Sequence, residues 1–151
     1  RNIALEIPEW DPKSCIQCGK CALACPHAAI RIKVYDKDEL KNAPSTFKHT
    51  RVKGKEWGEE DVYTIQVAPE DCTGCELCVE YCPAKNKADT SKKAINMIPQ
   101  EPVRHDEAEN WDFFFKLPEV DRSRVKVDSL KGSQLVLPLL ILADQIPNVV
   151  A

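Results

Sequence analysis

The sequence predicts a small antiparallel α+β fold of two similar halves, with inserted loops and a C-terminal arm. Three observations predict this fold. Two cysteine-rich stretches share one spacing, the segments that flank them also repeat, and alternating apolar residues next to them are typical of half-buried strands. The chain has 151 residues, which is enough for one domain with appendages.

The two cysteine-rich stretches are residues 15–26 (motif 1) and 72–83 (motif 2), and together they use all 8 cysteines. Each reads C-x2-C-x2-C-x3-C-P. This run holds [4Fe–4S] clusters in bacterial two-cluster ferredoxins. The sequence therefore predicts two [4Fe–4S] clusters inside a bacterial ferredoxin-like fold, with the two halves related by a pseudo-twofold axis.

The fourth cysteine of each motif is expected to ligate the cluster of the other motif. If Cys21 begins a short helix, Cys25 lies one turn further along the same face, roughly 6 Å along the axis. In two-cluster ferredoxins the fourth cysteine does ligate the other cluster. The expected ligands are Cys15, Cys18, Cys21 and Cys82 for cluster I, and Cys72, Cys75, Cys78 and Cys25 for cluster II.

Three other roles for these cysteines compete with the clusters. Structural zinc prefers pairs of ligands separated by a longer linker, and four closely spaced cysteines suit it poorly. A disulfide framework would need a secreted context, which nothing in the sequence indicates. Cysteines that were merely buried would not fall into two matched runs.

Strands are expected at residues 4–7, 30–34, 61–67 and 94–97, with a short helix in each motif that ends near Pro26 or Pro83. The first insertion, at about 35–61, contains the basic residues Lys48, His49, Arg51, Lys53 and Lys55. A solvated loop is the expected role for this basic patch, and docking of an acidic ferredoxin is the alternative. The second insertion, at 84–93, carries four lysines that are also expected to face solvent.

The two-cluster domain is expected to span residues 1–98, and residues 99–151 to form an arm that packs on the core or on a partner domain. The arm has no cysteine. Its aromatic residues Trp111, Phe113, Phe114 and Phe115 predict a short helix at 107–116, ending before Pro118. His27, beside motif 1, is expected to be a surface residue, with tuning of a cluster potential as the alternative.

Charge and composition exclude some classes of function. The formal net charge is −3, and two oxidised clusters would bring it to about −7, which argues against a nucleic-acid partner. The longest apolar stretch, 135–143, is interrupted by Pro138 and too short to span a membrane. No signal peptide is apparent, so a cytoplasmic location is expected. Because the chain begins at Arg1, a fragment or a processed chain is expected.

Several segments resemble one family closely. Residues 16–21, 25–31, 65–75 and 82–87 are similar to the ferredoxin domain of pyruvate:ferredoxin (flavodoxin) oxidoreductase. Segments of the arm agree, at 110–111, 113–114, 117–122 and 131–134. The resemblance covers about residues 10–139 and includes both insertions.

The resemblance implies that this chain supplies the medial and distal clusters of an electron relay. In that family, thiamine diphosphate decarboxylates pyruvate, coenzyme A takes the acetyl group, and single electrons leave through the clusters to external ferredoxin or flavodoxin. Thiamine diphosphate is then expected only in a partner domain or subunit. No phosphate-binding glycine motif and no nucleophile with a partnered base is evident in this chain, so no catalytic residue is expected in it.

Two departures from the family pattern matter. Glu76 occupies a position where the family favours glycine, so a changed backbone around cluster II is expected. Residues 140–151 lack the further cluster cysteines that the family places there. Two alternatives stay open: a two-cluster subunit of another redox complex, such as a hydrogenase or dehydrogenase, and an interaction module in which the metal is purely structural.

Overall fold

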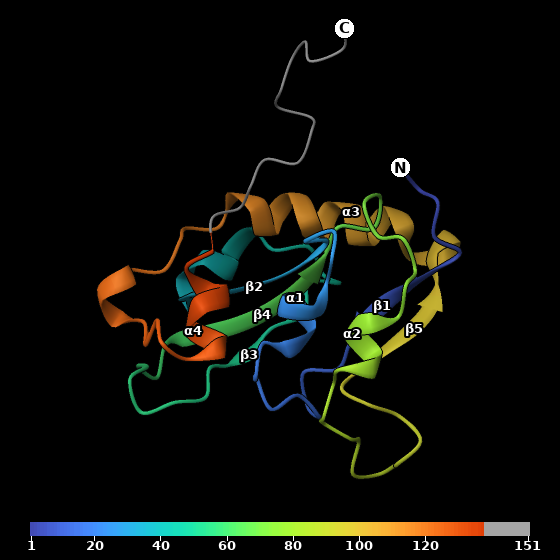
Figure 1. The fold of residues 1–151 in the computed structure, drawn as a ribbon. Helices are drawn as coiled ribbons and strands as arrows, with labels where there is room; N and C mark the ends of the chain where they lie inside the picture. Colours follow the sequence, from blue (N-terminus) through green and yellow to red (C-terminus); the bar gives the residue numbers. More distant parts are fainter. Residues whose placement is uncertain (138–151) are drawn as a thin grey trace, which may run out of the picture.

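The computed structural model describes residues 1–137. It is a small α+β structure in which two antiparallel sheets and several helices surround the cysteine motifs (Figure 1). The expected family features at 138–139 and 140–151 lie outside the described residues. Within residues 1–137, no helix is long and apolar enough to cross a bilayer.

Each sheet joins the strand before one motif to the strand after the other. β1 (Glu6–Trp10) precedes motif 1 and pairs with β5 (Ile95–Pro99), which follows motif 2. β4 (Asp61–Val67) precedes motif 2 and pairs with β2 (Ile30–Asp36), which follows motif 1. β3 (Thr50–Arg51) adds a short third strand to β4. The crossed pairing brings the two motifs together although about fifty residues separate them in the chain.

The first strand differs from its prediction at both ends. β1 begins at Glu6 instead of residue 4 and continues through Pro8 to Trp10. Proline lacks the N–H that a central strand needs, but β1 is half of a two-stranded sheet and has one free edge. The other three predicted strands are confirmed within a few residues.

The prediction that β2 and β4 are half-buried is wrong, because both faces of this sheet are covered. Every residue of β4 is buried, and so are Arg31 and Lys33 of β2. Lys33 Nζ donates to the Leu117 carbonyl at 2.6 Å and lies 2.9 Å from a carboxylate oxygen of Glu119. The C-terminal arm supplies the partners of Lys33. Thr64 of β4 donates instead to the Lys48 carbonyl in the first insertion at 2.6 Å, so the polar residues of the alternating pattern bind the arm and the insertion rather than solvent.

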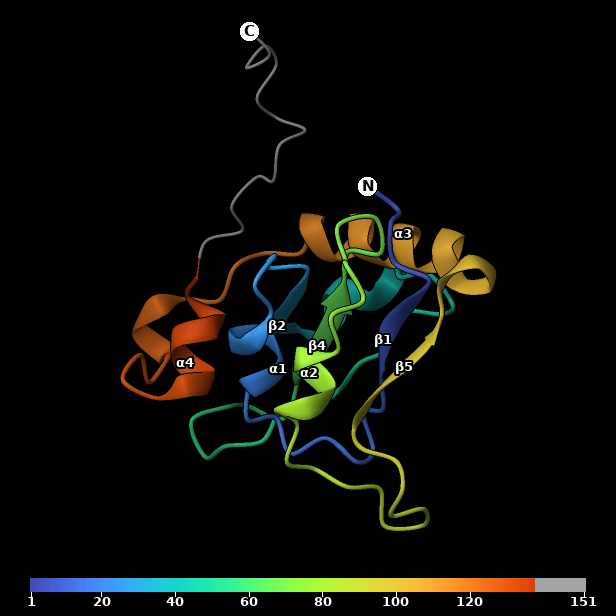
Figure 2. The ribbon, with the colours of Figure 1, turned by 45° about the vertical axis from the view of Figure 1, so that its right-hand side comes forward.

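The two motif helices are short and lie side by side (Figure 2). α1 (Lys20–Ala24) begins one residue before the predicted Cys21, and α2 (Leu77–Glu80) occupies the same place in motif 2. Cys25 follows the end of α1, and Cys82 lies two residues beyond α2. The fourth cysteine of each motif is therefore carried away from its own loop by the length of a short helix.

The arm begins with a helix that is longer than predicted. α3 spans Gln100–Lys116 instead of 107–116, and it follows β5 directly. Pro102 lies in its first turn, where the missing N–H has no intrahelical partner to lose. Trp111 stacks on Phe114, and Phe113 packs edge-on against Phe47, with ring centroids 5.2 and 4.8 Å apart. The aromatic residues thus fix α3 to β4 and to the first insertion.

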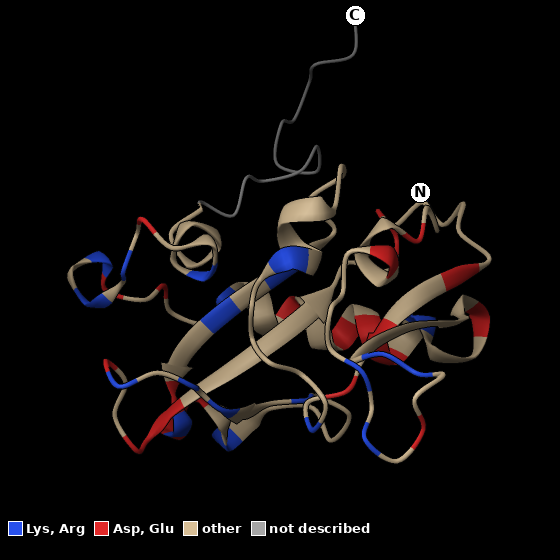
Figure 3. Cartoon of the chain, turned by 60° about the horizontal axis from the view of Figure 1, so that its bottom comes forward, with Lys and Arg blue, Asp and Glu red and all other residues tan. Residues whose placement is uncertain are grey.

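Two 3₁₀ helices and one more α-helix complete the described chain. η1 (Lys37–Asn42) opens the first insertion, and η2 (Arg122–Arg124) lies in the arm. α4 (Leu130–Leu135) ends the described arm and contacts both α1 and β2. The side chain of Ser129 caps α4 by accepting a hydrogen bond from the Gly132 amide. Charged residues of both signs are interspersed along the chain (Figure 3).

Candidate metal centres

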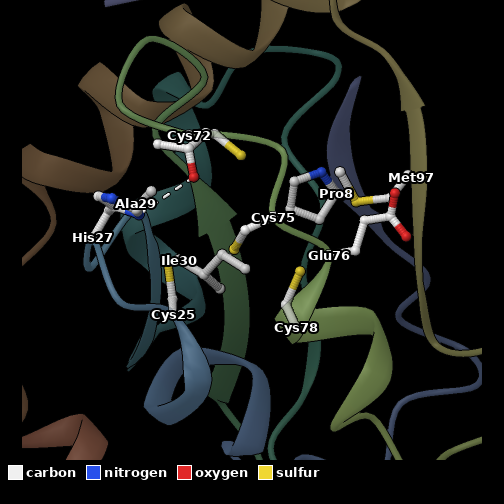
Figure 4. Close-up of a pocket in the computed structure, with 11 residues that line it drawn as sticks. Pro8, Cys25, His27, Ala29, Ile30, Cys72, Cys75, Glu76, Cys78 and Met97 are labelled. Carbon is white, nitrogen blue, oxygen red and sulfur yellow. Dashed lines mark hydrogen bonds between the residues drawn. The ribbon is translucent and has the colours of Figure 1, made fainter. Parts of the chain in front are cut away.

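Four cysteines line a cavity between the two sheets. They are the set predicted for cluster II: Cys25, Cys72, Cys75 and Cys78. In Figure 4 their sulfur atoms face one shared space, with Pro8, Ile30 and Met97 among the other lining residues. The cavity, here called cavity II, encloses about 310 Å³ that no atom occupies, part of it open to solvent.

The other four cysteines line a second cavity. These are Cys15, Cys18, Cys21 and Cys82, the set predicted for cluster I. Trp10, Ile65 and Ile95 also line this cavity, called cavity I, which has the same unoccupied volume of about 310 Å³. Each cavity therefore combines three cysteines of one motif with the fourth cysteine of the other.

Both cysteine loops turn at the same two positions, where one residue adopts the left-handed backbone conformation. In motif 1 these are at Gln17 and Gly19, with φ of 58° and 77°, and in motif 2 at Gly74 and Glu76, with φ of 70° and 62°. The turns aim backbone amides at sulfur: the Gln17 N–H donates to Cys15 Sγ at 3.2 Å. The Gly74 N–H donates to Cys72 Sγ at 3.4 Å. Amides directed at sulfur stabilise a bound thiolate and help set the potential of an iron–sulfur cluster.

The expectation that Glu76 changes the backbone is wrong. Glu76 adopts φ 62° and ψ 0°, close to the φ 77° and ψ 2° of Gly19 at the equivalent position. The loop keeps its geometry and Glu76 accepts the strain of a left-handed conformation, which costs roughly 1–2 kcal/mol for a residue with a Cβ. In Figure 4 its side chain lies near Met97 and its carboxylate points away from the four sulfurs.

Motif 1 is held by a set of hydrogen bonds that the sequence pattern does not predict. Gln17, which is buried, donates from its side-chain amide to the Arg51 carbonyl at 2.8 Å. Its side-chain oxygen accepts from the Lys53 amide at 2.7 Å and from Lys131 Nζ at 3.3 Å. Lys53 Nζ also donates to the Cys15 carbonyl at 2.7 Å. We call Gln17, Lys53 and Lys131 the clasp, because they join motif 1, the first insertion and α4.

Two buried donors next to motif 1, Trp10 Nε1 and Tyr63 Oη, form no hydrogen bond of normal geometry among the described residues. The Trp10 indole nevertheless interacts with Cys15 and offsets part of the rise that burial causes in the pKa of that thiol. The Trp10 and Tyr63 rings meet edge-on, with centroids 6.0 Å apart. Trp10 lines cavity I, and the buried Tyr63 hydroxyl interacts electrostatically with Cys21, Cys15 and Cys18. A buried donor without an acceptor is costly, so these groups fit a site that is completed by an electron-rich, sulfur-bearing cofactor.

The pKa values of the cysteine thiols also fit a bound iron–sulfur cofactor. All eight cysteines are free, and burial raises the pKa of Cys15, Cys21, Cys72 and Cys78 above the ordinary thiol value. Repulsion from neighbouring cysteines adds to the effect, and the pKa of Cys78 rises to about 12. Thiolates placed here therefore need cations beside them, which the iron of a cluster supplies.

Three lysine side chains bind partners within the molecule that the sequence does not predict. In the basic patch, Lys48 pairs with Glu9 at 2.6 Å, and Lys53 belongs to the clasp, so these two lysines bind within the molecule. In the second insertion, Lys93 Nζ donates to the Val79 carbonyl at 2.7 Å, at the end of α2. Lys53 is exposed, as expected of a solvated loop, although its ammonium group also binds the Cys15 carbonyl. Lys93 is half-buried, so the expectation that it faces solvent is wrong.

His27 lies at the rim of cavity II. It is exposed, and its Nδ1 lies 3.4 Å from Thr73 Oγ1. Figure 4 shows it beside Ala29 on the segment that joins α1 to β2. Its position agrees with the expected surface histidine and also places it close to the cysteines of motif 2.

Comparisons with known proteins agree with this site. Residues 14–86 match the 4Fe-4S dicluster domain family. The chain is 56% identical over 139 residues to the pyruvate-flavodoxin oxidoreductase of Trichormus variabilis and 48% identical to a probable pyruvate-flavodoxin oxidoreductase of Escherichia coli. Each match covers 92% of this chain and 12% of the relative. The pyruvate:ferredoxin oxidoreductase of Moorella thermoacetica is 44% identical, over 93% of this chain and 11% of its own length.

The range 14–86 contains both motifs and all eight cysteines that line the cavities, and the similarity to the relatives extends through most of the arm. The chain spans about an eighth of the length of the curated relatives it matches. Residues 14–86 are therefore similar to the 4Fe-4S dicluster domain family, and the chain as a whole is similar to one stretch of the pyruvate-flavodoxin oxidoreductases.

Proposed function

We propose that this chain is an electron relay that carries two [4Fe–4S] clusters with crossed ligands. The observation that supports it most is the division of the eight cysteines between two cavities. Cluster I is assigned to Cys15, Cys18, Cys21 and Cys82, and cluster II to Cys72, Cys75, Cys78 and Cys25. When bound, each cluster accepts and donates one electron at a time. The chain holds the clusters rigidly beside one another, because Cys25 and Cys82 tie each site to the helix of the other.

The proposed relay has a two-cluster domain at 1–98 and an arm at 99–151. We assign the domain the bacterial ferredoxin-like fold with a pseudo-twofold relation between its halves. The crossed pairing of β1 with β5 and of β4 with β2 supports this relation. Contacts of α3 and α4 with β4, α1 and β2 support an arm that packs on the core.

The relay is proposed to work within a larger oxidoreductase that acts on pyruvate. The names and the greater length of the relatives support this. The thiamine diphosphate site and the carbon chemistry are then assigned to a partner domain or subunit. External ferredoxin or flavodoxin is the proposed acceptor, and the cytoplasm the proposed location. A two-cluster subunit of another redox complex fits the cavities equally well, but not the similarity that extends through the arm.

The first test of the proposal is cofactor content and reducibility. Anaerobically prepared chain should contain about eight irons and eight acid-labile sulfides. It should be reduced reversibly by dithionite and reoxidised by a small ferredoxin or flavodoxin. About two zinc ions without sulfide would contradict the cluster assignment. Intact clusters that cannot be reduced would contradict the relay and favour a purely structural role.

A second test separates the relay from catalysis. Given pyruvate, coenzyme A and thiamine diphosphate, the purified chain should show no cluster reduction. Addition of a thiamine-binding partner from a related oxidoreductase should start it. Reduction of the clusters by pyruvate in the chain alone would place the catalytic site within these residues and overturn the assignment to a partner.

A further inference from the structure

The surroundings of the two cavities differ in hydrogen-bond donors. At cavity I, the buried Trp10 indole interacts with Cys15 without a hydrogen bond of normal geometry, and the Tyr63 hydroxyl is a buried donor without a partner among residues 1–137. Most of the lining of cavity II outside its cysteines is apolar, with Pro8, Ala29, Ile30 and Met97. Its side-chain donors, His27 and Thr73, lie at the exposed rim, where His27 Nδ1 and Thr73 Oγ1 are 3.4 Å apart. Hydrogen bonds to the sulfurs of a cluster stabilise its reduced form, which carries one more negative charge.

The surroundings also differ in charge. Lys131 Nζ lies 5.2 Å from the centre of the Tyr63 ring and 3.3 Å from Gln17 Oε1 of motif 1. Lys53 Nζ reaches the Cys15 carbonyl, so two ammonium groups contact the loop of cavity I. Glu56, which also interacts with Lys131, offsets part of this positive charge. Beside cavity II the corresponding loop carries the acidic Glu76, and the positive charge there is that of the buried Arg31, which interacts electrostatically with Cys25.

Solvent exposure acts in the opposite direction. Cys75 of cavity II is exposed, whereas Cys15 and Cys21 of cavity I are buried. Water stabilises the more highly charged, reduced form of an exposed cluster. The donors Trp10 and Tyr63 of cavity I are buried, in a low-dielectric surrounding where a dipole or charge has its largest effect. Lys131 is half-buried and Lys53 is exposed, so their charges are partly screened by water.

We infer that Trp10, Tyr63 and Lys131 make cavity I the better electron-holding site, so that the first electron taken up by the relay rests on the cluster of Cys15, Cys18, Cys21 and Cys82. The inference rests on the proposed function, since it needs both clusters to be bound. It gives the relay a direction. A reduced cluster II and an oxidised cluster I exchange one electron, leaving cluster II oxidised and cluster I reduced. Electrons that enter the pair therefore move toward the cluster in cavity I.

The single methionine of the chain provides a reporter. Met97 lines cavity II, and it is not among the residues that line cavity I. In chain labelled with ¹³C at the methionine methyl, an unpaired electron on cluster II should shift the Met97 signal. Full reduction defines the complete shift. After the addition of one electron per chain, the shift should stay below about one tenth of its complete value. With about nine tenths of cluster I and one tenth of cluster II reduced, the reduced-to-oxidised ratios of the two clusters differ about 80-fold, which corresponds to about 110 mV at about 59 mV per tenfold for a one-electron couple.

Variants test which groups set the preference. Trp10→Phe and Tyr63→Phe remove one donor each while keeping the ring, and Lys131→Met removes the charge at similar length. Each should raise the Met97 shift after one electron, the combination should raise it about fivefold or more, and Lys131→Arg should restore the wild-type value. Lys116→Met, which removes an exposed lysine of α3, is the matched control and should leave the shift unchanged.

The outcomes separate this inference from the proposed function. A chain without iron and sulfide would contradict the proposed function itself. With both clusters present, a Met97 shift that is complete after one electron would overturn the inference, as would a wild-type preference unchanged in Lys131→Met and the two phenylalanine variants. Lys131 is only partly buried, so Lys131→Met remains a usable test even if substitution of the buried Tyr63 prevents folding.

Discussion

Motif 1 and motif 2 have the same cysteine spacing and nearly the same loop backbone, yet motif 1 is covered by α4 at Gly19 whereas motif 2 is exposed at Glu76. A Cβ added to Gly19 would lie 3.2 Å from Leu130 Cδ2 and 3.3 Å from Lys131 Cα of α4. At the equivalent position of motif 2, the Glu76 side chain is exposed. The comparison shows that the cysteine run specifies the turns, whereas the surrounding chain decides which residues the turns can carry.

The same difference appears at the other left-handed position. Gly74 lies against the segment that enters β1, and a Cβ there would be 3.2 Å from the Glu6 carbonyl. Gln17 at the matching position has room for a side chain and uses it to bind Arg51, Lys53 and Lys131. In each motif, glycine thus occupies the left-handed position that neighbouring chain crowds, and a residue with a side chain occupies the other left-handed position.

The largest effect is expected for Gly19→Ala. The added Cβ meets the backbone of α4 and also forces a residue with a side chain to φ 77°. Overpacking and strain together should destabilise the chain by about 2–4 kcal/mol. Anaerobic denaturation, followed by loss of the cluster absorbance, should show a clearly lower midpoint. Gly58→Ala is the control, because Gly58 has no positive φ and the added Cβ would meet only the carboxylate of Asp61, at 3.3 Å, so it should lower the midpoint less than Gly19→Ala. Equal midpoints for the two variants would mean that α4 does not press on motif 1.

A somewhat smaller effect is expected for Gln17→Leu. Leucine keeps the size of the side chain but leaves the Arg51 carbonyl and the Lys53 amide without their partner. The cost should be about 1–3 kcal/mol, measured by the same denaturation. A double-mutant cycle with Lys131→Met should show non-additive effects, because both residues belong to the clasp. Additive effects would show that Gln17 and Lys131 act independently.

The smallest effect is expected for Glu76→Gly. Glycine relieves the strain of φ 62° but makes the unfolded chain more flexible, so the two contributions largely cancel. Stability should rise by less than about 1 kcal/mol. The opposite signs of Gly19→Ala and Glu76→Gly, at equivalent positions, are the sharpest consequence of the comparison. A loss of stability in Glu76→Gly would mean that the glutamate side chain makes a stabilising contact.

Much of the site could be predicted from the sequence because cysteine spacing is a local property. The division of the cysteines between two sites follows from three residues on a loop and a fourth beyond a short helix, as seen at Cys25 and Cys82. The strands were predictable where an alternating pattern is local, as in β2 and β4. Helix α1 was placed within one residue for the same reason.

What could not be predicted depends on residues far apart in the chain. Gln17 and Lys131 meet across 114 positions, and nothing in either local sequence indicates the partner. The burial of Lys33 depends on the arm, which supplies Leu117 and Glu119. The early start of α3 was missed because Pro102 reads as a helix breaker, although a first turn tolerates proline.

The crossed assignment of the fourth cysteine is the claim on which both the relay and its asymmetry depend. It is tested most directly by comparing Cys25→Ser with Cys72→Ser in anaerobically prepared chain, using the Met97 methyl signal and the electron paramagnetic resonance spectrum of each reduced variant. Both substitutions should disturb the same cluster, the one beside Met97, and leave the signal of the other cluster intact. If Cys25→Ser disturbed the cluster beside Trp10 while Cys72→Ser disturbed the one beside Met97, each motif would hold its own cluster, and the account would be contradicted.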